Sequence, residues 1–126
     1  MSKISHKELL NLNMGLVYMS EVGTGAWYQV AKNIRVFKKH LLEYEESHKS
    51  IMEKLADKNK DGSIKINDKG HVSFGNNLEK ANEMYTSLMD EEIDVEFHKF
   101  SYDKIGDVKL DALKIEPLLD TLILDE

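Results

Sequence analysis

The sequence contains no cysteine and only one proline, Pro117, among its 126 residues. Without cysteine, the chain cannot form disulfide bonds, thiolate zinc sites or a cysteine nucleophile, and this composition suits a reducing compartment. Long apolar runs are also missing, because the apolar stretch over residues 9–19 is too short to span a bilayer and precedes no small-residue cleavage site. The sequence therefore predicts a soluble intracellular protein that does not enter a membrane.

Basic charge is scarce as well. The chain has 17 Lys and Arg against 23 Asp and Glu, a net charge of -6. This balance argues against direct nucleic-acid binding, which needs clustered cations, and we interpret the short basic run over residues 32–39 as a solvated helix face. Gly-x-Ser-x-Gly and P-loop motifs are absent, so we expect no enzyme activity. The length predicts a single domain over residues 1–126.

Two amphipathic helices are predicted in the first half of the chain. Ser5 and Glu8 form a Ser-x-x-Glu capping box before a helix with an apolar face. Glycines at 23 and 25 then predict a turn, and apolar residues at alternating spacings of three and four predict a second helix over about 26–57. Its apolar stripe comprises Trp27, Val30, Ile34, Phe37, Leu41, Tyr44, His48, Ile51 and Leu55.

The pattern changes to strands after residue 55. Two short strand-like runs around an Asn-Asp-Lys-Gly turn predict a β-hairpin at 63–74, and alternating apolar and acidic residues predict a half-buried strand at 92–98. Helices are expected from about residue 78 and from Pro117, which would stand in the first turn of a last helix that carries Leu118, Leu119, Leu122 and Ile123. The fold class is therefore α+β, with a long N-terminal helical hairpin, a small antiparallel β-sheet (the β-hairpin plus one strand) and two shorter C-terminal helices.

The order of these elements and several short sequences resemble a known family. The long helix carries AKNIRVFKKHLLEYEESHKSIMEKLADKNKDG, and EEIDVEFHKFSYDKI follows the next predicted helix. Over residues 26–126, the chain resembles a family of small bacteriophage and prophage proteins of Gram-positive hosts, which is grouped as a domain of unknown function. The resemblance implies a phage origin, and with it a location in the host cytoplasm. It implies no activity and no functional residues.

The twelve residues that begin at Asp57 partly match a calcium-binding loop. Asp57, Asn59 and Asp61 occupy its first, third and fifth positions, Gly62 occupies the sixth, and Asp68 the twelfth. An EF-hand needs a bidentate glutamate at the twelfth position and a helix after it, whereas Asp68 is shorter and precedes a strand-like run. The alternative, which we favour, is an Asp-Gly turn between helix and hairpin. Calcium is the one cofactor that the sequence suggests.

Two sets of residues are candidates for binding a partner protein. Trp27 lies on the apolar stripe of the long helix, and Tyr28 lies off it, so we expect Trp27 in the core and Tyr28 at an interface. Glu92, Asp94 and Glu96 line one face of the predicted strand, and the interpretation we favour is a solvated face whose charge discourages aggregation. The alternative is a partner-binding surface that mimics phosphates toward a nucleic-acid-binding enzyme. A homodimer through the long helix or residues 9–19 is a further alternative.

Taken together, these patterns favour binding over catalysis. The leading hypothesis is a phage-encoded accessory protein that binds a host-encoded protein, and we suggest a host defence factor that it inhibits. Two alternatives stay open: a structural or assembly component of the virion, and a calcium-binding module that uses the 57–68 loop.

Overall fold

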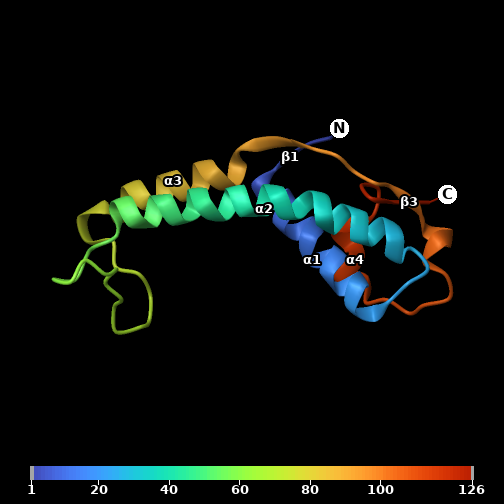
Figure 1. Ribbon diagram of the computed structural model, residues 1–126, viewed down its shortest axis with the longest axis horizontal. Helices are drawn as coiled ribbons and strands as arrows, with labels where there is room; N and C mark the ends of the chain where they lie inside the picture. The colour runs from blue at the N-terminus through green and yellow to red at the C-terminus, as the bar shows by residue number, and fades with distance from the viewer. Residues whose placement is uncertain (1, 126) are drawn as a thin grey trace. The chain divides into compact units, whose positions relative to one another are not determined.

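The computed structural model describes residues 2–125, which divide into two compact units. The first unit comprises residues 2–41 and 92–125, and the second comprises residues 42–91. The long helix α2 (Trp27–Leu55) contributes residues to both units (Figure 1). Long N-terminal helices together with two small sheets confirm the α+β class. The expectation of one domain over residues 1–126 stays a prediction.

Helix α1 (His6–Val22) begins and ends at the predicted caps. The Ser5 hydroxyl accepts the Glu8 backbone N–H at 3.1 Å, and the Glu8 carboxylate accepts the Ser5 backbone N–H at 3.4 Å. At the other end, the N–H of Gly23 donates to the Met19 carbonyl at 3.0 Å. The φ of Gly23 is 81°, a left-handed conformation that glycine adopts without strain. Both signals are local, so the sequence predicts them well.

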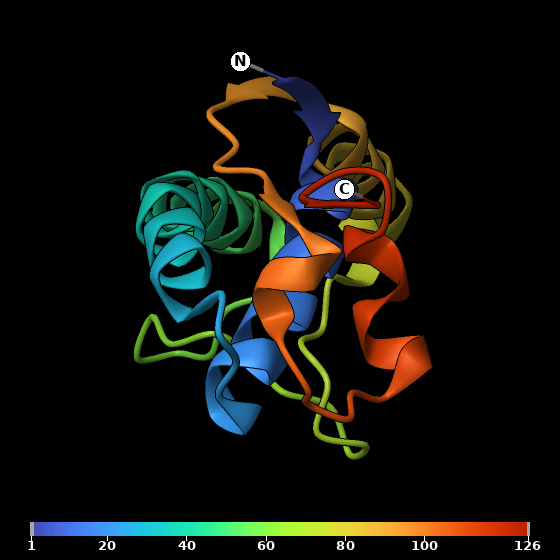
Figure 2. The ribbon, with the colours of Figure 1, turned by 90° about the vertical axis from the view of Figure 1, so that its right-hand side faces the viewer.

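The core of the first unit joins α1 to α2 and to the C-terminal segment. The apolar face of α1 is buried, and Val30 and Phe37 of α2 pack with its residues Leu9, Leu12, Leu16 and Met19. Helix α4 (Ala112–Ile115) and the 3-10 turn η3 (Glu116–Leu118) pack on α1 (Figure 2). The expectation of a last helix that begins at Pro117 is wrong. Helix α4 ends before this proline, Pro117 stands in η3, and Ile123 belongs to a strand. The C-terminal core residues are Ile115, Leu118, Leu122 and Ile123.

Two small sheets complete the first unit. Strand β1 (Ser2–Ser5) pairs antiparallel with β2 (Glu92–Val95), side by side in Figure 2, and β3 (Phe100–Ser101) pairs parallel with β4 (Ile123–Leu124). The 3-10 turn η2 (Tyr102–Ile105) follows β3. The predicted strand at 92–98 is thus present but ends at Val95, and its partner is the N-terminal segment rather than the hairpin. Alternation reveals a strand but does not identify its partner.

The second unit pairs the latter part of α2 with α3 (Leu78–Asp90), which follows the 3-10 turn η1 (Gly75–Asn77). Its core cluster comprises the buried residues Ile51, Leu55, Ala81 and Leu88. The region expected to form a β-hairpin shows only isolated bridges, one of which joins Ile66 and Val72. It belongs to neither sheet among the described residues. Ile66 is 53% exposed, so the apolar alternation there has no core to bury it and no ladder extends.

Candidate functional site

Three of the four residues suggested as calcium ligands, Asn59, Asp61 and Asp68, belong to two similar turns of the second unit, and Asp57 precedes the first turn. In the first turn, Gly62 N–H donates to the Asn59 carbonyl at 3.0 Å, and Asn59 N–H donates to the Ser63 carbonyl at 2.8 Å. The turn from Asn67 to His71 repeats these two bonds at 2.9 and 2.7 Å. The glycines of the two turns have φ values of 87° and 81°, as such turns require. Turn chemistry therefore accounts for the Asn and Gly spacing.

The polar side chains of the first turn bond to one another. The Asp61 carboxylate accepts the Ser63 hydroxyl at 2.6 Å and the Ser63 N–H at 3.0 Å. These two bonds, the hydroxyl first, lower the pKa of Asp61 below its ordinary value. The Asn59 amide donates to the same Ser63 hydroxyl at 3.0 Å. Ser63, which is not part of the predicted ligand set, therefore organises this turn.

Asp57 and Asp68 have separate surroundings. The Asp57 carboxylate accepts the Ser73 hydroxyl at 2.9 Å, and Asp68 is exposed in the second turn. Within residues 2–125, no group of three or more His, Cys, Asp or Glu side chains is placed to hold a metal ion. The contacts fit the turn interpretation, and calcium binding stays a prediction.

The predicted acidic face lies on β2 and just beyond it. Glu92 and Asp94 are exposed on the strand, and Glu96 follows it, also exposed. Lys3 of β1 stands directly opposite Asp94, an opposite-charge pairing that offsets part of the negative field. The Glu96 carboxylate lies 3.7 Å from Nε2 of His98. The three acids are therefore available to a partner, and their role in binding stays a prediction.

A buried asparagine that was not among the predicted residues holds the segment after β2. Asn33 of α2 is 0% exposed, and its Oδ1 accepts the His98 backbone N–H at 2.8 Å. Its Nδ2 donates to the carbonyls of His98 and Gln29, each at 2.9 Å. The sequence signal that could have identified Asn33 is its spacing, because it lies three residues after Val30 and four residues before Phe37, on the buried side of the helix. A polar residue at these positions of a buried stripe must find partners.

The first turn of α2 carries two exposed aromatic rings. Tyr28 is 53% exposed, as an interface residue must be. Trp27 is 66% exposed, so the expectation that it lies in the core is wrong; the buried stripe begins instead with Ala26 and Val30. The two rings meet edge to face with centroids 5.7 Å apart, and the Lys32 ammonium lies 4.6 Å from the Tyr28 centroid. We call Trp27, Tyr28 and Lys32 the aromatic patch.

A groove of about 390 Å³ lies beside the aromatic patch, where α1 ends and α2 begins. Trp27 lines it together with apolar side chains of both helices and the cations Arg35 and Lys38. Trp, Tyr and Arg are the residue types that contribute most to binding hot spots. The first turn of α2, which carries the patch, lies apart from β1, the strand that pairs with β2, within the first unit (Figure 1). The structure therefore does not gather Tyr28 with the acidic strand residues.

The first unit also exposes apolar side chains of α1 that lie outside its buried face. Met14 is 71% exposed and Val17 is 39% exposed, and both line a hollow of about 520 Å³ with Leu113 of α4, which is 85% exposed. Apolar surface of this kind is commonly covered by a partner or a second copy. The homodimer through residues 9–19 stays a prediction, and Met14 and Val17 are the residues through which it would form.

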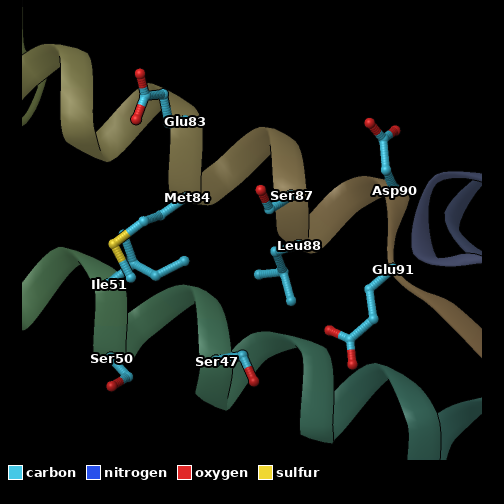
Figure 3. A pocket seen from close by; sticks show the side chains of 9 residues that line it. All are labelled: Ser47, Ser50, Ile51, Glu83, Met84, Ser87, Leu88, Asp90 and Glu91. Atoms are coloured by element: carbon cyan, nitrogen blue, oxygen red, sulfur yellow. The ribbon is translucent and has the colours of Figure 1, made fainter.

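In the second unit, a groove of about 920 Å³ runs along α2 and α3 (Figure 3). Ile51, Met84 and Leu88 supply its apolar surface, and Glu83, Asp90 and Glu91 supply its charge. Three serines complete the lining: Ser47, Ser50 and Ser87. No sequence pattern indicated this groove, because its residues come from two helices that are separated along the chain.

No protein-family model, no curated protein and no solved structure matches this chain. The resemblance to small phage proteins therefore stays a prediction, and the functional argument depends on the geometry. Within residues 2–125, none of the helices combines the length and the apolar composition needed to cross a bilayer.

Proposed function

We propose that this chain is a phage-encoded, non-catalytic accessory protein that binds another protein through the aromatic patch, in the host cytoplasm. The observation that supports the proposal is the exposure of its only tryptophan, Trp27, together with Tyr28, at 66% and 53%. Neither ring is needed for the core, since Ala26 and Val30 already supply the buried start of α2. Surface aromatics of this kind are enriched at protein interfaces.

The patch can contribute a useful binding free energy. Aromatic side chains bury about 150–250 Å² each, so two rings exposed to this degree leave roughly 200 Å² for a partner to cover. At about 25 cal/mol per Å², covering them supplies about 5 kcal/mol before the costs of association. The adjacent groove offers further surface that a partner side chain can fill. Its cations Arg35 and Lys38 favour an acidic partner surface.

The partner that we propose is host-encoded. The resemblance to phage proteins suggests a host defence factor that the chain inhibits by occupying a surface. A structural or assembly role in the virion is the second candidate, and the exposed pair Met14 and Leu113 favours it, because self-assembling subunits cover such surfaces with copies of themselves.

Affinity capture from a Gram-positive host tests the proposal with three tagged proteins. These are the wild type, the double variant Trp27→Ala/Tyr28→Ala, and Leu42→Ala as the control. Leu42 is 52% exposed on the same helix, 14 residues after Tyr28 in the sequence. We expect the wild type and the control to retain the same host protein and the double variant to lose it at least tenfold.

Two outcomes would contradict the proposal: retention of the protein by the double variant, or equal loss in the Leu42→Ala control. Light scattering on the purified wild type separates the two candidate roles. A monomer or dimer agrees with an accessory protein, and a ring-like oligomer supports the virion role.

A further inference from the structure

The groove between α2 and α3 has an apolar floor (Figure 3). The side chains of Met84 and Leu88 point from α3 toward α2, and Ile51 points from α2 toward α3. Ile51 and Leu88 are each 7% exposed, and Met84 is half-buried. These residues form the inner wall of an open depression of about 920 Å³.

The hollow exists because short side chains stand beside this floor. Ser47 and Ser50 on α2 and Ser87 on α3 line it, and each of them reaches less far than the aromatic residues that fill the rest of the helix pair. Two helices alone cover each other incompletely, and a domain normally buries such a surface under another layer. The groove therefore presents a place for a third element to pack.

The charge of the lining has one sign. Glu83, Asp90 and Glu91 are exposed and line the groove, and no Lys, Arg or His is among its lining residues. In Figure 3, Glu83 and Asp90 point away from α2 while Glu91 points toward it, so the carboxylates surround the floor rather than converge. This agrees with the absence, within residues 2–125, of a group placed to hold a metal ion. The carboxylates instead favour a partner with several separated cations.

We propose that this groove binds a basic amphipathic helix of another protein. Apolar side chains at helical spacing would cover Ile51, Met84 and Leu88, and flanking Lys or Arg side chains would pair with the carboxylates. The α3 residues of the lining span 83–90, about 12 Å of helix, so a partner segment of two to three turns suffices. This surface is separate from the aromatic patch, so the chain has two binding surfaces that prefer opposite charge.

Fluorescence anisotropy with designed peptides on the full chain tests this proposal. The probe is a lysine-rich helix of about 16 residues with leucines at i, i+3, i+4 and i+7. A scrambled peptide of the same composition removes the apolar face and keeps the charge. We expect the amphipathic peptide to bind at least tenfold more tightly than the scrambled one, with affinity that falls as salt rises.

Charge reversal locates the binding. In the groove variant, Glu83, Asp90 and Glu91 are changed to Lys, which should weaken the amphipathic peptide at least tenfold. In the control variant, Asp103, Asp107 and Asp125 are changed to Lys; all three are exposed, none lines the groove, and the net charge changes equally. We expect the control to lose less than threefold.

A steric variant tests the groove without changing its charge. Ser87 is exposed, so Ser87→Phe should fold normally while its ring occupies the hollow and weakens the peptide at least tenfold. Amide chemical shifts should change mainly over residues 47–51 and 83–91 when the peptide is added. Trp27→Ala should bind the peptide as the wild type does, so this proposal and the proposed function can fail separately.

Several results would overturn the inference. Equal binding of the scrambled peptide, or an equal loss in the control variant, would show that only net charge acts. Shift changes outside the groove would place the peptide elsewhere. A dimer of the free chain that the groove variant abolishes would assign the groove to a second copy instead of a partner helix.

Discussion

Replacing Asn33 with alanine removes the side chain that joins α2 to the segment after β2. Asn33 is 0% exposed and makes two bonds to the backbone of His98, at 2.8 and 2.9 Å, and a third to the Gln29 carbonyl at 2.9 Å. The bond to Gln29 is the least important, because that carbonyl also accepts the regular helical bond. Alanine leaves both His98 groups without these partners.

The expected loss follows from the two bonds to His98. A hydrogen bond contributes about 0.5–1.5 kcal/mol net, and a buried group that is left unpaired costs about 1–3 kcal/mol. Because His98 is only partly buried and water can reach some of its groups, we expect Asn33→Ala to destabilise the first unit by about 3 kcal/mol. At a urea slope of about 1.5 kcal/mol per molar, the unfolding midpoint should fall by about 2 M.

Urea unfolding followed by circular dichroism measures this shift, and hydrogen exchange at the His98 amide reports the local effect. The matched control is Asn82→Ala, an exposed asparagine in α3, which should change the free energy of unfolding by about 0.5 kcal/mol or less. If Asn33→Ala lost less than about 1 kcal/mol while the control behaved as expected, the Asn33 bonds would not be what holds the segment.

Three further predictions concern the turns. Gly25→Ala should destabilise the first unit by about 1–3 kcal/mol, because its Cβ would collide with the Lys104 carbonyl oxygen; a melting temperature equal to that of the wild type would contradict this. The lowered pKa of Asp61 means that its stabilising contribution is present above the ordinary value of 3.8 and is lost as the pH falls through the folded-state pKa. Asp61→Asn should therefore lose less stability than the wild type between about pH 5 and pH 2, and equal pH profiles would refute the reasoning. Calorimetry with millimolar calcium should show no binding heat, whereas a heat that Asp57→Asn removes would establish a metal site at the 57–68 loop.

The candidate sites divide into a part that the sequence predicts and a part that it does not. The exposure of Tyr28 follows from its place off the stripe, and the exposure of Glu92, Asp94 and Glu96 follows from strand alternation. The exposure of Trp27 does not follow from the sequence. A stripe shows which face of a helix is apolar, but it does not show how far along the helix other segments pack against that face. The grooves are not predictable either. Each of them is lined by side chains from segments that are separated along the chain, and it forms only where those segments pack together.

By itself, the sequence determined the two long helices, the caps of α1 and the glycine turns of the 57–74 region. These features depend on residues within a few positions of one another, so composition and spacing specify them directly. Only the tertiary structure decided that Ser2 pairs with Val95, that Asn33 bonds to His98, and that α2 and α3 leave a groove between them. Such contacts join residues distant along the chain, and the energy that selects one pairing over another arises only when the segments have packed.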